Sequence, residues 1–384
     1  MRGLILLFIS VLLHISIFAQ QNPICLTNDY PPNQAKSSRS INDKKTVRIN
    51  VHFMLKSNGT GNFRETDDGN GSADYNGYMY ANDLTDWINN GCSTNQQMNI
   101  PTGNTTPVIS KNFFFVLDAV YFWKNDATYN FQTINYITQG RDKDSVLNIF
   151  LSYDPNNGPA GGYASNLNPN SNVKFTENKY YWQQYLYNID NGYPFSWFIG
   201  GTGSNTIHEL GHLLGLSHTV RWNHAPPCPT GCPGYGPINS LCDDGCDDTP
   251  TAWDIMSANG CTTHPACGWN TGGQPDCSNN LMDYNGSNAL TPCQIGIVHS
   301  SLEGGMKSYL SCSAVSNDLT LCDIGYPKLS YFGKDVSIGC VATPADVSSS
   351  EEIKVYFSNF VELTNFEVNS DSEFEIILEN NCNF

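Results

Sequence analysis

Positive charge is scarce in this sequence. Its 384 residues contain 19 lysines and arginines against 36 aspartates and glutamates, which gives a formal net charge of −17. A chain with so few cations lacks the basic surface that attracts nucleic acids and anionic membranes, so both are disfavoured as partners. Basic partners are compatible with this charge, which by itself identifies no function.

Long apolar runs are absent after the first twenty residues, so no later segment is predicted to span a bilayer. The first twenty, MRGLILLFISVLLHISIFAQ, combine Arg2, an apolar run and the small residue Ala19, as a secretory signal peptide does. The alternative, a membrane anchor, needs a longer apolar run than this one. We therefore expect residues 1–20 to be a signal peptide and residues 21–45 a polar leader or short pro-segment of a secreted, extracellular protein.

Cysteine is plentiful, and all fourteen cysteines lie after the signal segment. An even number of cysteines in an exported chain predicts disulfides, although their pairing does not follow from the spacing. Residues 225–293 are rich in Cys, Pro, Gly and Asp and have little apolar periodicity. This segment is expected to form a disulfide-rich subdomain, because it cannot bury a large apolar face.

The apolar periodicity of the remaining chain predicts an α+β fold. Strands are expected at 46–55, 111–123 and 145–153, and helices at 78–92 and 290–305. Strands separated by helices predict a mixed twisted sheet with helices packed on it, in one domain over residues 46–316. Residues 317–384 contain short alternating segments separated by turn residues, which predicts a small all-β module. No long repeat is evident.

Histidine is rare, yet three of the eight histidines fall within HELGHLLGLSH at residues 208–218. On a helix, His208 and His212 lie one turn apart on the same face, where two imidazoles can bind one metal ion. Gly215 can adopt the left-handed backbone that ends a helix, which lets His218 return as a third ligand. Three nitrogen ligands and one open position are typical of catalytic zinc, whereas structural zinc usually has four protein ligands.

Glu209 follows the first of these histidines and points to its side. There it can accept a proton from a metal-activated water instead of binding the metal. The alternative is a helix with incidental histidines, but five fixed positions arise by chance in on the order of 10⁻⁵ chains. We therefore predict Zn²⁺ bound by His208, His212 and His218, with Glu209 as general base and acid.

The pattern HExxHxxGxxH resembles the signature of the metzincin zinc endopeptidases. Metzincins also have a methionine turn beneath the metal, which Met282 in NNLMDYNG matches. The segments GGYASN (161–166), CDDTP (246–250) and LTPCQ (290–294) are similar to the pappalysin branch, the relatives of pregnancy-associated plasma protein A. The resemblance covers roughly residues 46–310. The stretch YPFSWFIGGTGSNT before the motif departs from that pattern.

This resemblance implies a metzincin-like peptidase domain that hydrolyses peptide bonds in a protein or peptide substrate. It implies that Met282 forms a hydrophobic floor under the imidazoles and that Tyr284 stabilises the oxyanion of the tetrahedral intermediate; a packed turn tyrosine is the alternative. GGYASN is either the sheet edge that pairs with an extended substrate or a plain glycine turn. A binding or adhesion protein on an inert scaffold would have lost Glu209 or a ligand, and this sequence has lost neither.

Two further hypotheses concern latency and a second ion. Cys25 lies in the leader, where the resemblance implies that its thiolate occupies the open metal position; a disulfide is the alternative. CDDGCDDTP places four carboxylates within six residues, and Ca²⁺ takes six to eight oxygen ligands. A calcium site is therefore predicted beside the alternative of a solvated acidic turn. The four residues are Asp243, Asp244, Asp247 and Asp248. The oligomeric state is not predicted.

Overall fold

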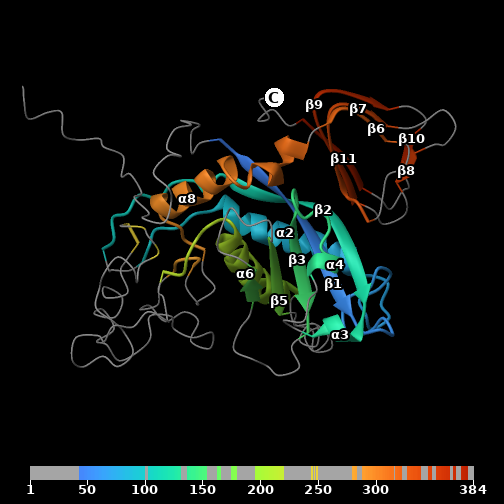
Figure 1. Cartoon of the computed structure of the whole chain (residues 1–384), viewed down its shortest axis with the longest axis horizontal. Coiled ribbons are helices and arrows are strands. Elements are labelled where there is room, and N and C mark those ends of the chain that lie inside the picture. The colour runs from blue at the N-terminus through green and yellow to red at the C-terminus, as the bar shows by residue number, and fades with distance from the viewer. Residues whose placement is uncertain are drawn as a thin grey trace, which may run out of the picture.

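The computed structural model describes residues 43–99, 103–130, 136–153, 162–165, 174–179, 195–219, 244, 246, 248–249, 279–282, 288–314, 316–321, 327–338, 345–347, 352–363, 366–368 and 373–378. Within these residues a five-stranded sheet comes first along the chain. A four-stranded sheet and a two-stranded sheet follow it (Figure 1). The five-stranded sheet and its helices position the histidine motif.

The five-stranded sheet is mixed and mostly parallel. Its strands are β1 (Lys45–Leu55), β2 (Phe113–Lys124), β3 (Leu147–Ser152), β4 (Gly162–Ala164) and β5 (Phe175–Lys179). Their spatial order is β2-β1-β3-β5-β4, and only β4, at one edge, runs antiparallel to its neighbour. Parallel neighbours need crossover connections, and α2 (Gly77–Ser93) provides the one between β1 and β2. The mixed sheet with packed helices agrees with the fold class expected from the sequence.

Both faces of β1, an interior strand of this sheet, are buried, as is typical of parallel sheets. One face belongs to the main apolar core, through Val47, Ile49, Val51 and Phe53. The other face carries polar side chains, among them His52, whose Nε2 lies 2.7 Å from Asn148 Oδ1. Trp123 Nε1 donates to His52 Nδ1 at 2.9 Å. Burial lowers the pKa of His52 to about 3, so this ring is a neutral structural group.

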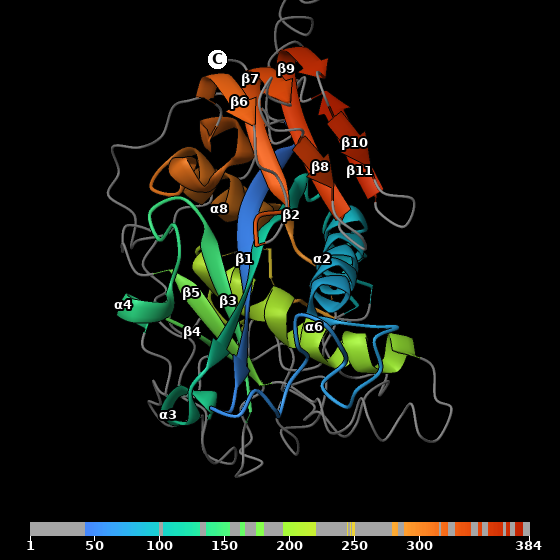
Figure 2. The same ribbon diagram turned by 90° about the vertical axis from the view of Figure 1, so that its right-hand side faces the viewer.

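Helices α2 and α6 (Phe195–Leu213) lie on the same side of this sheet (Figure 2). Asn76 caps α2, because its side chain accepts hydrogen bonds from the backbone N–H groups of Tyr78 and Met79. The two helices pack closely where α6 has a glycine: a Cβ on Gly203 would lie 2.3 Å from the ring of Trp87. The small size of Gly203 therefore lets α6, the helix that carries the histidine motif, pack closely against α2.

Helix α8 (Pro292–Glu303) begins with a capping box formed by Thr291 and Gln294. The remaining described helices have three or four residues each. The short ones are α3 (Asp126–Tyr129), α4 (Tyr136–Gln139), η1 (Lys307–Tyr309) and η2 (Ser311–Ala314). The three strands and two helices expected from the sequence are present, with ends within two residues of those observed. In the described part of the chain, no helix has the length and apolarity needed to cross a membrane.

The C-terminal strands pair in parallel throughout. The four-stranded sheet has the order β11-β9-β7-β6, formed by β11 (Glu373–Leu378), β9 (Glu352–Leu363), β7 (Ser330–Ile338) and β6 (Ser316–Leu321). The two-stranded sheet joins β8 (Ala345–Val347) to β10 (Phe366–Val368). Ala345 pairs with Phe366 and Glu352 with Glu373, an offset of 21 residues in both cases. The β8–β9 segment therefore pairs in parallel with the β10–β11 segment that follows it, whereas β7 pairs with β9 at an offset of 24 residues, between Ser330 and Lys354.

The segment before β7 runs along the outer edge of β2 and so joins the two parts of the structure. Val120 N donates to Pro327 O at 2.9 Å, and Leu329 N donates to Asp118 O at 2.8 Å. Ser330 Oγ donates to Leu117 O at 2.6 Å. The predicted domain boundary at residue 316 stays a prediction, but the segment beyond it completes an edge of the first sheet.

A buried ion cluster lies at this junction. The Asp118 side chain is fully buried and accepts from Arg48 Nη2 at 3.0 Å and from Lys328 Nζ at 3.0 Å. Arg48 is itself buried, whereas the Lys328 side chain is 38% exposed. Asp118 therefore neutralises one cation that is largely withdrawn from water and one that is well exposed to it.

We predict that Asp118→Ala destabilises the protein far more than Lys328→Met does. Without Asp118, the charge of Arg48 stays buried and unpaired, which costs about 3–5 kcal/mol in the free energy of unfolding. Lys328 can hydrate, so its loss should cost at most about 1 kcal/mol. Equilibrium urea unfolding measures both values. Equal and small effects would contradict the assignment of Asp118 as the anchor of the junction.

Candidate metal centre

Helix α6, which carries the histidine motif, ends two residues before Gly215. The last helical residue of α6 is Leu213, and Gly215 has a φ of +97°, in the left-handed region that glycine tolerates. Leu216 N donates to Gly211 O and Gly215 N to His212 O, both at 3.0 Å. This is the hydrogen-bond pattern of a Schellman helix end, and it turns the chain back towards α6.

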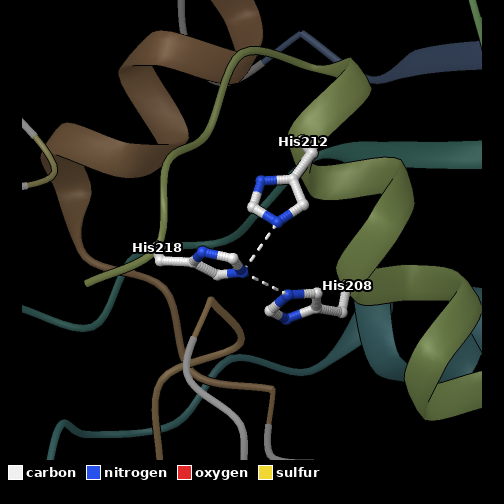
Figure 3. Close-up of side chains that lie close together, drawn as sticks. All are labelled: His208, His212 and His218. Carbon is white, nitrogen blue, oxygen red and sulfur yellow. Dashed lines mark hydrogen bonds between the residues drawn. The ribbon is translucent and has the colours of Figure 1, made fainter. Parts of the chain in front are cut away.

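The turn brings three imidazoles together (Figure 3). Nε2 of His218 lies 3.1 Å from Nε2 of His208 and 3.0 Å from Nε2 of His212. Each ring offers a ligand nitrogen, and the three nitrogens lie within 4.8 Å of one another. Two nitrogens bound to one zinc ion at ~2.0–2.1 Å in tetrahedral geometry are about 3.3 Å apart. The three side chains therefore fit a metal ion of this size.

The opposite ring nitrogens of the two helical histidines fix their tautomers. His208 Nδ1 lies 2.8 Å from Leu281 O, and His212 Nδ1 lies 2.8 Å from Leu216 O. A carbonyl oxygen can only accept, so each Nδ1 carries a proton and donates it. The Nε2 lone pairs then point towards His218, as in metal sites whose ligands donate to a carbonyl.

The rings of His208 and His212 are uncharged, which allows them to bind a cation. Burial lowers the pKa of His208, and burial together with the neighbouring His208 lowers the pKa of His212 to about 3. Both rings are therefore neutral, as metal ligands must be. His218 Nε2 can carry one proton at most, and this proton cannot fully satisfy two inward lone pairs. A cation at the centre would satisfy all three nitrogens.

Glu209 is a buried carboxyl group beside this ligand set. It is 8% exposed and lies against the edge strand, because a Cβ on Gly162 would be 2.8 Å from Glu209 Oε1. Burial raises the pKa of Glu209 to about 8. A cation held by the adjacent imidazoles would oppose this shift, because it stabilises the charged carboxylate.

Met282 packs against the helical turn that carries the ligands. It is fully buried, and its Sδ lies 2.6 Å from the position that a Cβ on Gly211 would take. Thr219 N donates to Met282 O at 3.3 Å, and the preceding residue supplies the carbonyl that holds His208. Residues 279–282 are thus fastened to both ends of the motif.

A buried polar network supports this methionine segment from the far side. Asn280 Oδ1 accepts from Met282 N at 2.8 Å, and Asn280 Nδ2 donates to Gln294 Oε1 at 2.8 Å. Gln294 Nε2 donates in turn to Asp244 Oδ2 at 2.9 Å. Helix α8 therefore holds the methionine segment in place through one glutamine.

Two of the four aspartates proposed for calcium lie among the described residues, and both accept hydrogen bonds from protein groups. Asp244 Oδ1 accepts from Cys246 N at 3.0 Å and from Thr249 Oγ1 at 2.7 Å. Asp248 Oδ2 accepts from Cys293 N, in the first turn of α8, at 2.9 Å. These contacts give both carboxylates a structural role, and the calcium site stays a prediction.

Several predicted site residues lie outside the described residues. They are Tyr284, Asp243, Asp247 and Cys25. One disulfide links described cysteines, between Cys246 and Cys293, with a Cα–Cα distance of 5.6 Å. It ties the acidic segment to the start of α8, within the region where a disulfide-rich subdomain was expected. Cys92, in contrast, is buried and unpaired with another cysteine.

The residues that support the site were not among those predicted from the sequence. Gly211 leaves the space that Met282 fills, and Gly162 leaves space beside Glu209. Neither requirement is visible in the sequence, because both depend on contacts with distant segments. Gln294 could have been found, since Thr291 followed three residues later by Gln294 is the capping-box pattern.

No protein-family model matches the chain, and no curated protein matches it. Among solved structures, the chain is similar to mature mirolysin of Tannerella forsythia in complex with a cleaved peptide. The identity is 15% over 69% of this chain and 95% of that chain, with a TM-score of 0.41. A chaperone–substrate complex matches with 12% identity over 70% of this chain and 35% of that chain, with a TM-score of 0.31. Similarities this low assign neither fold nor activity, so the function is inferred from the residues of the site.

We predict opposite effects for two glycine substitutions in α6. Gly201→Ala meets nothing within 4 Å and should stabilise the protein by ~0.5–1 kcal/mol, because alanine favours the helix. Gly211→Ala collides with Met282 Sδ and should lose that gain and destabilise by about 1–3 kcal/mol. Urea unfolding measures both, and zinc analysis should show weaker metal retention only for Gly211→Ala. Equal stabilisation by both variants would disprove the packing of Met282 against the ligand turn.

Proposed function

We propose that this protein is a secreted zinc-dependent endopeptidase of the metzincin type, most similar in its motifs to the pappalysin branch. One observation carries the proposal: three imidazoles, those of His208, His212 and His218, converge on one point beside the buried carboxyl group of Glu209. Three nitrogen donors without a fourth protein ligand among the described residues suit a catalytic zinc site. The N-terminal signal segment supports secretion.

Zinc held by these rings would act as a Lewis acid that polarises the substrate carbonyl and lowers the pKa of water. Glu209 takes a proton from the attacking water and later delivers it to the departing amine. Its burial suits both steps, because a desolvated carboxyl group binds a proton more readily than an exposed one. Met282 supports the imidazoles from the side of Gly211, and Tyr284 is proposed to donate a hydrogen bond to the oxyanion.

The substrate is proposed to be an extended protein or peptide segment. Strand β4 is the outermost strand of the five-stranded sheet, and its Gly162 lies against Glu209. A peptide that pairs with this edge by main-chain hydrogen bonds would pass beside the proposed general base. The alternative, an inert binding scaffold, is not favoured, because all three ligands and Glu209 are present and close together.

The first prediction for this function is that Glu209→Ala abolishes casein hydrolysis without loss of zinc. The variant removes the proton acceptor but no ligand, so activity should fall by at least ~10²–10⁴-fold. Glu303→Ala is the matched control, because it removes a carboxylate of α8 that forms an ion pair with Lys45 and is neither a proposed metal ligand nor the proposed base. Cleavage is followed with and without a zinc chelator, and zinc is measured by mass spectrometry. Near-normal hydrolysis by a pure Glu209→Ala preparation would refute the proposed function.

The second prediction is that His212→Ala loses zinc and activity together. Removing one of three ligands leaves two, which is too few for a tight protein site. His299→Gln serves as the control, because His299 is a buried histidine of α8 whose Nε2 contacts Lys111 O at 2.9 Å, outside the metal centre. One zinc per chain is expected for the control and a small fraction of that for His212→Ala. Equal zinc content in both variants would place the metal elsewhere.

A further inference from the structure

One aromatic side chain is exposed on the sheet edge beside Glu209. Tyr163, the middle residue of β4, is 45% exposed, whereas the other described aromatic residues of the five-stranded sheet are buried or half-buried. Edge strands commonly carry charged residues or proline, which discourage pairing with another chain. Strand β4 has the sequence GYA and carries neither. This edge is therefore suited to pairing, and Tyr163 is the one large side chain of β4.

The alternation of side chains along β4 places Tyr163 on the sheet face opposite Glu209. Successive side chains of a strand point to opposite faces. Gly162 faces Glu209, because the position that a Cβ on Gly162 would take lies 2.6 Å from Glu209 Cγ. Ala164 faces the same way and packs against the main core. Tyr163 points to the other face, so it takes no part in the proton transfers attributed to Glu209.

The ring of Tyr163 packs against further aromatic rings on this other face. Its centroid lies 6.4 Å from that of Phe175 on β5, at an interplanar angle of 62°. Phe175 lies 5.7 Å from Phe150 on β3, edge to face, and Phe150 is fully buried. Tyr163 is thus the exposed end of an aromatic row that crosses three strands. A tyrosine held in this way can contact a second molecule with little loss of side-chain freedom.

A peptide paired with the outer edge of β4 would bring a side chain to this ring. The peptide residue directly opposite Tyr163 places its side chain on the same face, with the two Cβ atoms ~4.5–5.5 Å apart. Its two neighbours in the peptide point to the face of Gly162 and Glu209. The residue opposite Tyr163 is therefore adjacent in sequence to a residue that faces the proposed general base.

The surroundings of Tyr163 favour an apolar partner. Glu177 stands opposite Tyr163 in the pairing of β4 with β5, but it is 2% exposed and accepts from Ser152 Oγ at 2.8 Å. Its carboxylate is therefore held inside the sheet. The surface offered to a peptide is the exposed part of the Tyr163 ring. Across neighbouring strands, aromatic and β-branched side chains pair favourably with an aromatic residue.

We propose that Tyr163 is a specificity-determining residue, which selects substrates with an aromatic or β-branched side chain at the position opposite it. The inference rests on the proposed peptidase function and on the pairing of the substrate with β4. It adds the class of peptide that this edge prefers. The role of Tyr163 is recognition of a side chain close to the cleaved bond and not chemistry at that bond.

The test compares full-length, zinc-loaded Tyr163→Ala, Tyr163→Phe and Leu378→Ala with the wild type. Leu378 is the matched control, because it is also a large side chain, 49% exposed, on an edge strand, β11 of the four-stranded sheet. Digestion of a peptide library, analysed by mass spectrometry, identifies the position at which the wild type selects aromatic or β-branched residues. Two synthetic peptides that differ only at this position, with phenylalanine or serine, then give kcat/KM.

Tyr163→Ala should lower kcat/KM for the phenylalanine peptide about 3–10-fold, the effect of losing one aromatic pair. Its kcat/KM for the serine peptide should stay within twofold of the wild type. Tyr163→Phe should retain the preference, because the ring makes the contact, and Leu378→Ala should match the wild type. All four proteins should contain one zinc per chain.

A binding measurement separates recognition from catalysis. In the Glu209→Ala background, which is expected not to cleave, the labelled phenylalanine peptide can be titrated and its binding followed by fluorescence anisotropy. Adding Tyr163→Ala should raise its Kd by the same factor of about 3–10, whereas adding Leu378→Ala should leave the Kd unchanged.

The outcomes separate this inference from the proposed function. A wild type that cleaves peptides, together with a Tyr163→Ala variant that has lost the preference, supports the inference. An unchanged preference in Tyr163→Ala overturns it and leaves the peptidase function intact, as does a wild type that selects acidic or basic residues at this position. A zinc-loaded wild type that cleaves no peptide of the library refutes the peptidase function, and the inference with it.

Discussion

Two carbonyl oxygens determine what the histidine motif can do. Leu281 O and Leu216 O hold the Nδ1 protons of His208 and His212, so the Nε2 lone pairs converge. Rings with the other tautomer would direct N–H groups at each other, and no cation could bind between them. The Schellman turn at Gly215 supplies one of these carbonyls as it returns the chain to His218, and the methionine segment supplies the other. The metal site therefore depends on backbone geometry as much as on the histidines.

The methionine segment is held in turn by α8. Asn280 and Gln294 connect Met282 to Asp244, and the disulfide between Cys246 and Cys293 fixes the acidic segment to the same helix end. Segments that follow the histidine motif in the sequence thus fold back and hold the residues that contact it. Asp244 and Asp248, two of the four aspartates that suggest an ion site in the sequence, accept hydrogen bonds from the backbone N–H groups of Cys246 and Cys293, and the second contact lies at a helix start, where dipole and capping effects favour a carboxylate.

Much of the site was predictable because it is local. His208, His212 and Gly215 are related by helix geometry, and the structure assembles them with His218 as their spacing predicts. The helices and strands near the motif were predictable from periodicity for the same reason. The rest depends on contacts between distant segments: Gly211 with Met282, Gly162 with Glu209, and the parallel strand pairs beyond residue 316. Parallel pairing leaves no turn signature in the sequence, so the C-terminal strands could be expected but not their arrangement.

X-ray absorption at the zinc edge tests the central claim most directly. The Cys25→Ala variant should be used, because it removes the one cysteine proposed to reach the metal. The account predicts one zinc per chain, three imidazole nitrogens and a light fourth ligand at ~2.0–2.1 Å, and no sulfur at ~2.3 Å. A sulfur shell in this variant, or a protein that binds no zinc at stoichiometric concentration, would contradict an open metal centre formed by His208, His212 and His218.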